Sequence, residues 1–86
     1  MAEIIEYNIM GKRIKKCRLE MGLSVEEVAG IMRVKKSIYL SYEAGTRDMK
    51  ISKLLLLSRL FHVSTDYLLG ATDLKTSPFD EGTRSE

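Results

Sequence analysis

The sequence contains few residues that form covalent or metal cross-links. Cys17 is the only cysteine and His62 the only histidine among 86 residues. One cysteine cannot form a disulfide within the chain, and one cysteine with one histidine is too few for a four-ligand zinc site. A disulfide scaffold and a structural zinc site are therefore excluded.

Long apolar runs and leader-like patterns are also missing. No apolar stretch approaches the ~20 residues that span a bilayer, and the first residues lack the charged, apolar and small-residue order of a signal peptide. At 86 residues and 44% hydrophobic content, the chain has the size of one small domain, which buries roughly 60% of the surface that its unfolded form exposes. We therefore expect a cytoplasmic protein with no membrane partner.

Groups of residues that carry out catalysis are missing as well. The sequence shows no paired catalytic carboxylates, nucleophile–base pair, metal-ligand cluster or glycine-rich phosphate loop. Cys17 lies at an apolar helical position, which favours a buried, inert thiol over a nucleophile. We predict that the protein is not an enzyme and has no cofactor, metal or evident small-molecule ligand.

Positive charge is concentrated in one half of the chain. The net charge is +2, but residues 11–47 contain nine Lys or Arg against four acidic residues, a local net charge of +5. A localised basic field suggests a polyanionic partner. Basic surface is common, so this signal is weak by itself.

Apolar residues three and four positions apart predict five helices and no strands. Ser24 and Glu27 form a capping-box pattern, and Leu23 with Val28 a hydrophobic staple, so one helix begins at Val25. The expected helices cover about 10–21, 25–32, 36–43, 51–61 and 65–69. We predict an all-α fold with an N-terminal arm at 1–9, a folded domain at 10–72 and a flexible tail at 73–86.

The helical spacing also predicts which side chains face inward. Tyr39 and Tyr42 fall on the inner face of the third helix. The inner face of the fourth helix comprises Ile51, Leu54, Leu57, Ser58 and Phe61. Leu56 and Leu60, four residues apart, then form an outer apolar stripe, which is typical of an interface.

Two short helices joined by a tight turn near 33–34, with cations on the second, are the arrangement of a DNA-binding helix-turn-helix. The stretches "GLSVEEVA", "YEAG" with Arg47, and "VSTDYLLG" resemble the phage-repressor and Cro-like helix-turn-helix family, also called the XRE family, over about residues 11–72. The resemblance implies a five-helix lambda-repressor-like fold. It also implies a sequence-specific transcriptional regulator, a repressor of bacterial or phage type, that binds double-stranded DNA as a homodimer.

The resemblance and the helical geometry assign the DNA contacts. One stripe of the third helix matches the base-reading positions: Lys36, Ser37, Leu40 and Ser41. The expected phosphate contacts are Lys35, Arg47, Arg13 and the backbone N–H of Val25. The alternative is that Lys35 and Lys36 only form a solvated face.

Lys35 stands where the family commonly has a hydroxylated helix cap, whose loss costs about 1 kcal/mol. Cations at the positive end of the helix dipole add a further penalty. A phosphate bound there would reverse both effects, because it accepts from the free N–H groups and pairs with the lysines.

Other matches to the family imply structural roles. Arg18 and Glu43 occupy the positions of an ion pair between the first and third helices. Arg33 replaces the turn glycine and is expected in a left-handed conformation, and His62 is expected at a helix end.

The function and assembly have open alternatives. The same scaffold suits a protein-interaction module, such as an antirepressor or antitoxin-like partner, and salt-dependent DNA binding discriminates the two. Leu56 and Leu60 are candidates for a dimer contact, unless Ile4, Ile5 or Tyr7 covers them within one subunit.

Overall fold

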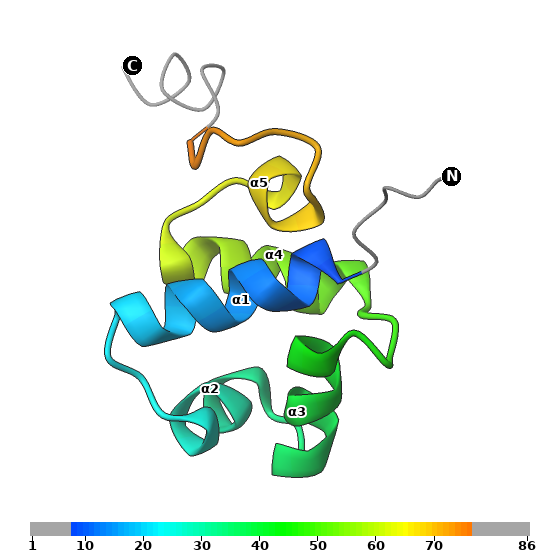
Figure 1. Ribbon diagram of the computed structural model, residues 1–86. Coiled ribbons are helices and arrows are strands. Elements are labelled where there is room, and N and C mark those ends of the chain that lie inside the picture. The colour runs from blue at the N-terminus through cyan, green and yellow to red at the C-terminus, as the bar shows by residue number, and fades with distance from the viewer. Residues whose placement is uncertain (1–7, 77–86) are drawn as a thin grey trace.

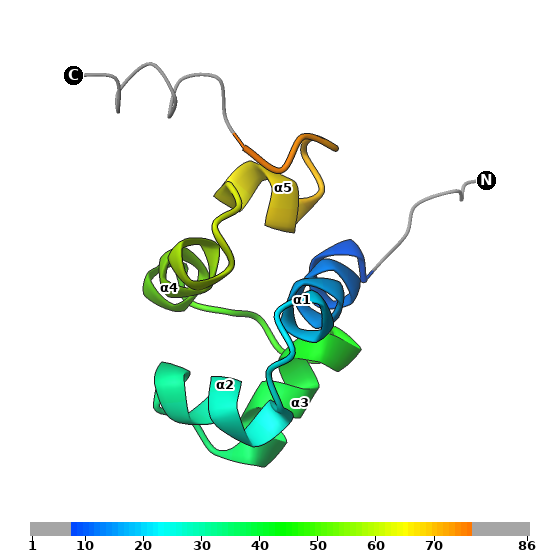
Figure 2. The same ribbon diagram turned by 90° about the vertical axis from the view of Figure 1, so that its left-hand side faces the viewer.

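The computed structural model describes residues 8–76 and contains five helices there. They are α1 (Ile9–Glu20), α2 (Val25–Met32), α3 (Lys36–Ala44), α4 (Ile51–Phe61) and α5 (Thr65–Leu69). Helices α1 and α4 lie in the middle of the molecule, with α5 on one side and the α2–α3 pair on the other (Figures 1 and 2). The described range contains no strand, so the all-α, five-helix prediction is confirmed.

Local sequence signals explain where the helices begin. The Ser24 side chain accepts a hydrogen bond from the backbone N–H of Glu27 at 3.0 Å, and the Glu27 carboxylate accepts from the N–H of Ser24 at 2.7 Å. This reciprocal capping box confirms the predicted start of α2. At α5, only the cap side chain takes part, with the Ser64 hydroxyl oxygen accepting from the N–H of Tyr67 at 2.9 Å.

Two helices end at non-glycine residues in the left-handed conformation. Arg33 has φ 60° after α2, and His62 has φ 58° after α4. The left-handed conformation of Arg33 costs about 1–2 kcal/mol. It allows the N–H of Val34 to bond to the carbonyl of Ala29 at 3.0 Å. The left-handed residue ends α2 after two turns and sets the tight turn into α3, as expected.

All five helices contribute to the core, which lies between α1, α4, α5 and the α2–α3 pair. Its members with least exposure are Ile14, Val28, Met32, Tyr39, Leu57 and Leu68. Tyr39, Tyr42 and Cys17 are buried as predicted. Ile51 is the exception, because it is the first residue of α4 and remains 74% exposed.

Helices α1 and α3 approach each other almost backbone to backbone. Asn8 caps α1 by accepting from the N–H of Gly11 at 3.1 Å, and its amide donates to the carbonyl of Glu43 at 2.8 Å. A Cβ added at Gly11 would lie 2.4 Å from that carbonyl oxygen. Asn8 and Ile9, which fall in the predicted arm, therefore belong to the folded part.

The predicted ion pair between Arg18 and Glu43 is present. Arg18 Nε donates to Glu43 Oε2 at 2.7 Å, and each side chain is 9% exposed. The Tyr39 hydroxyl donates to the same carboxylate oxygen. Burial, and then the hydrogen bond to Glu43, raise the pKa of Tyr39, while the hydrogen bond to Glu43 raises the pKa of Arg18.

The segment after α5 folds back onto α1. Arg13 donates to the carbonyls of Tyr67 and Thr72, both at 2.6 Å, and pairs with Asp73 at 2.7 Å. Its guanidinium also lies 4.3 Å from the centre of the Tyr67 ring. The first residues of the predicted tail therefore pack on the domain, whereas residues 77–86 lie outside the described range.

None of the helices within residues 8–76 combines the length and the apolar character that crossing a membrane requires.

Candidate nucleic-acid interface

The N-terminus of α3 is formed without a side-chain cap. Lys35 occupies the N-cap position with φ −68° and ψ 152°, and its side chain makes no cap hydrogen bond. Ser24 and Ser64 supply that bond at α2 and α5, whereas α4 begins, like α3, at an uncapped lysine, Lys50. The first turn of α3 therefore presents backbone donors beside two lysine side chains, Lys35 and Lys36.

The predicted base-reading residues lie on the side of α3 that faces away from the core. Lys36, Ser37 and Leu40 are exposed, and Ser41 is half-buried. Tyr39 and Tyr42, on the opposite side, are buried. Leu40 keeps 41% of its surface exposed, so this stripe offers a cation, hydroxyls and one apolar side chain.

Arg47 connects the loop after α3 to the same stripe. Its Nε donates to the Ser41 hydroxyl oxygen at 3.2 Å, and that hydroxyl donates to the carbonyl of Ile38 at 2.5 Å. A hydroxyl has one hydrogen and two acceptor lone pairs. Ser41 therefore keeps one lone pair, which suits it to accept from a base amino group.

Lys36 is already paired within the chain. Its Nζ lies 2.8 Å from Oε2 of Glu26, in the first turn of α2. The hydrogen bond from Lys36 holds the pKa of Glu26 below its usual value. The ten-residue separation across a turn is not a recognised pairing pattern, so the sequence gives no signal of this contact.

The start of α2 is less suited to phosphate than predicted. The capping box uses the N–H of Glu27, and the first turn carries the carboxylates of Glu26 and Glu27. These negative charges oppose an anion at that end of the helix. The Val25 backbone therefore lies in unfavourable electrostatic surroundings for a phosphate contact.

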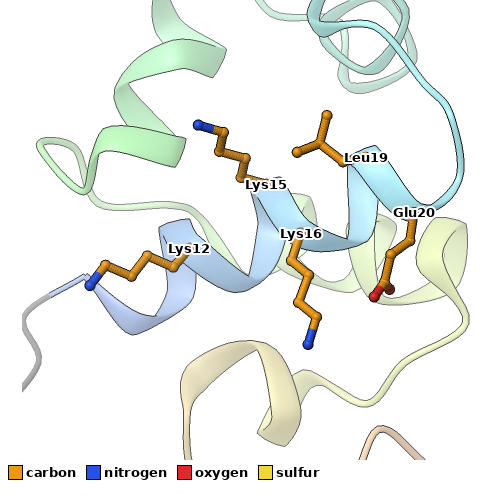
Figure 3. Close-up of a pocket in the computed structure, with 5 residues that line it drawn as sticks. All are labelled: Lys12, Lys15, Lys16, Leu19 and Glu20. Carbon is orange, nitrogen blue, oxygen red and sulfur yellow. The ribbon is translucent and has the colours of Figure 1, made fainter.

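Arg13 is engaged elsewhere. Its guanidinium is occupied by Tyr67, Thr72 and Asp73, so a phosphate would have to compete with these acceptors. The three lysines of α1 line an open hollow along that helix (Figure 3). The residues lining it are Lys12, Lys15, Lys16, Leu19 and Glu20. Lys15 and Lys16 extend to opposite sides of α1 (Figure 3).

Lys53 supports the helix-turn-helix from α4. Its Nζ donates to the carbonyl of Met32 at 2.7 Å, at the last residue of α2. A cation at this end offsets the negative pole of the helix dipole. Only the folded chain brings Lys53 to this carbonyl, so sequence reasoning missed it, as it did Asn8 and Glu26.

The outer surface of α4 differs in detail from the predicted stripe. Leu56 and Leu60 are partly buried and pack against the core. Leu55 is 42% exposed and Ile51 is 74% exposed. The most accessible apolar side chains of α4 are therefore one helical turn apart at positions 51 and 55.

Comparison with known proteins agrees with this geometry. A helix-turn-helix family model matches residues 14–68. The chain belongs to the helix-turn-helix family, as its resemblance to phage-repressor and Cro-like proteins predicted. The matched range includes α2, α3 and α4 complete.

Two curated relatives come from Bacillus subtilis (strain 168). The uncharacterized HTH-type transcriptional regulator YobD is 39% identical over 62 residues, which are 72% of this chain and 55% of YobD. The HTH-type transcriptional regulator ImmR is 38% identical over 65 residues, which are 76% of this chain and 51% of ImmR. The chain thus spans about half the length of the curated relatives it matches.

A solved structure shows the same fold. The crystal structure of SinR, a master regulator for biofilm formation, in complex with DNA superimposes with a TM-score of 0.63. The two chains are 36% identical, and the match covers 70% of this chain and 97% of the SinR chain.

Proposed function

We propose that this protein is a sequence-specific DNA-binding transcriptional regulator that inserts α3 into the major groove. The exposed stripe of α3, headed by an uncapped, cationic N-terminus, is the observation that carries the proposal. In a helix-turn-helix, the second helix enters the groove with its N-terminal residues against base edges. The relatives named as transcriptional regulators, and the SinR complex with DNA, support the same function.

Each side chain of the stripe suits a different part of a base edge. Lys36 donates to the O6 and N7 atoms of guanine, and Leu40 packs on a thymine methyl group. Ser37 can donate or accept, so it tolerates several bases. Ser41, whose hydrogen is held by the Ile38 carbonyl, accepts from an adenine or cytosine amino group.

Lys35 and Arg47 are the phosphate contacts at the two ends of α3. At Lys35, phosphate would accept from the backbone N–H groups of the first turn and pair with the ammonium group. At Arg47, the guanidinium stays exposed while Ser41 orients its Nε. Such contacts set the register of the protein on DNA without reading its sequence. Val25 contributes less to phosphate binding, because Glu26 and Glu27 lie beside it. Arg13 also contributes less, because its guanidinium is bonded within the protein.

The protein is further proposed to bind DNA as a homodimer. Two recognition helices about 34 Å apart would read two half-sites one turn apart. Exposed Leu55 on α4 supports an interface there. Light scattering on Leu55→Glu tests this contact without disturbing the core, whereas Leu56→Glu also removes packing. A mass equal to one chain for the wild type would contradict the dimer.

Fluorescence anisotropy tests DNA binding. The full chain is titrated into labelled duplexes from its own gene neighbourhood, with scrambled competitor, at two salt concentrations. We expect the complex with one duplex to persist in the presence of competitor. Lys36→Ala should weaken binding to that duplex. Lys16→Ala, which changes a cation on α1, is the matched control and should have little effect. Binding that competitor abolishes for every duplex, with no effect of Lys36→Ala, would contradict the proposal.

A further inference from the structure

An acidic side chain of α2, Glu26, contacts Lys36 on the proposed DNA-binding face. Glu26 is the second residue of α2, and its Oε2 accepts from Lys36 Nζ at 2.8 Å. The side chains are 64% and 57% exposed. An ion pair therefore spans the turn and ends on the residue proposed to read a base.

The ion pair between Glu26 and Lys36 contributes little to folding stability. Exposed ion pairs contribute little, because water screens them and the side chains lose freedom. The helix dipole of α2 is already offset by Glu27, whose carboxylate completes the capping box. In contrast, Glu26 places a negative charge beside a surface that has to approach phosphates, where it lowers affinity for any DNA.

We propose that Glu26 is a specificity-determining residue that restrains Lys36 from binding phosphate. An ammonium group has three hydrogens, so Lys36 can keep its contact with Glu26 while it donates to O6 and N7 of a guanine. Those base atoms are neutral acceptors and tolerate the neighbouring carboxylate. A phosphate is an anion, and Glu26 repels it from the same position.

The inference rests on the proposed function and adds a discriminating role to it. With Glu26 present, Lys36 contributes to binding where a guanine is suitably placed and contributes little on other sequences. Without its charge, Lys36 would pair with a phosphate on any sequence. Glu26 therefore lowers binding to random DNA more than binding to the preferred site.

Glu26→Gln removes the charge and keeps the size of the side chain. For the full chain on a random-sequence duplex, we expect several-fold tighter binding. The slope of log K against log salt should steepen by about 0.9, the value for one additional neutralised phosphate. Selection from a randomised duplex library should show a weaker guanine preference at the position read by Lys36.

Glu27→Gln is the matched control. It removes one charge from the same turn and keeps an oxygen that can accept from the N–H of Ser24. It should leave the guanine preference unchanged and alter the salt slope by less. In a Lys36→Ala background, Glu26→Gln should lose most of its effect on both measurements, and thermal melting would confirm that every variant is folded.

The outcomes distinguish a failure of the role of Glu26 from a failure of the proposed DNA-binding function. If Glu26→Gln and Glu27→Gln change the salt slope and the base preference equally, Glu26 acts only as a diffuse charge, and the specificity role is overturned. The same follows if Lys36→Ala leaves the effect of Glu26→Gln intact. If no form of the chain binds any duplex, the proposed function fails, and the role of Glu26 fails with it.

Discussion

Arg18 donates to Glu43 at 2.7 Å, and this pair joins the last turn of α1 to the last turn of α3. The same guanidinium bonds to the carbonyl of Leu23 at 3.0 Å, in the connection to α2. Three segments of the domain therefore converge on one side chain. This buried contact, as well as apolar packing, therefore holds α3 in its orientation relative to α1.

Removing the acid of this pair should destabilise the domain strongly. Glu43→Ala leaves Arg18 charged in a site where it is 9% exposed, and breaking such a buried pair typically costs about 3–5 kcal/mol. Glu43→Gln keeps oxygen and nitrogen atoms for hydrogen bonds and should cost less. Urea denaturation measures both. A free energy of unfolding within about 0.5 kcal/mol of wild type for Glu43→Ala, the size expected of a surface substitution, would contradict this role.

Stability should fall at alkaline pH through Tyr39. Burial and the hydrogen bond to Glu43 raise the pKa of this phenol above its ordinary value of 10.0. The folded state thus favours the protonated phenol, so its contribution is complete below pH 10 and is lost as the pH rises above it. Tyr39→Phe should be less stable at neutral pH and should lose stability less steeply above pH 10. Thermal melting of both proteins across a range of pH provides the comparison. Equal losses of stability above pH 10 for wild type and Tyr39→Phe would contradict this role of Tyr39.

Two glycines should respond in opposite directions to the same substitution. In Gly11→Ala the new Cβ would lie 2.2 Å from Asn8 Oδ1 and 2.4 Å from the Glu43 carbonyl oxygen, so α1 and α3 must separate and stability must fall. Gly30→Ala meets nothing within 4 Å and should stabilise α2 by up to ~1 kcal/mol. Chemical denaturation of both variants tests the close approach. Equal effects would show that the helices are not in tight contact at Gly11.

Neighbouring lysines at the start of α3 should have different roles on DNA. Lys35→Ala should weaken binding to all sequences and reduce the salt slope by about 0.9, because it removes a phosphate contact. Lys36→Ala should reduce discrimination at one base position, because it removes a donor to a base edge. Salt titrations on two duplexes distinguish these effects. Equal losses on both duplexes for Lys36→Ala would assign it to the backbone instead.

Local sequence rules predicted the helices because each boundary is set by neighbouring residues. The capping box at Ser24 and the left-handed ends at Arg33 and His62 are properties of a few consecutive positions. Helical spacing likewise located Tyr39 and Tyr42 in the core. Ile51 satisfies the same periodicity but is exposed, since periodicity does not show where a helix extends beyond its neighbours.

The parts that sequence did not reveal depend on distant pairs. Glu26 with Lys36, and Lys53 with the Met32 carbonyl, meet only after the chain has folded. Arg13 has the charge of a phosphate contact, yet its guanidinium packs on Tyr67. A cation in the sequence therefore does not show whether its partner is DNA or the protein itself.

Chemical-shift mapping by NMR tests the central claim most directly. A ¹⁵N-labelled full chain is titrated with a duplex obtained by selection from a randomised library. The account predicts the largest backbone shifts at residues 35–41 and at Arg47, with little change at Lys16 on α1. Shifts concentrated on α1 or α4, with α3 unchanged, would contradict insertion of α3 into the major groove.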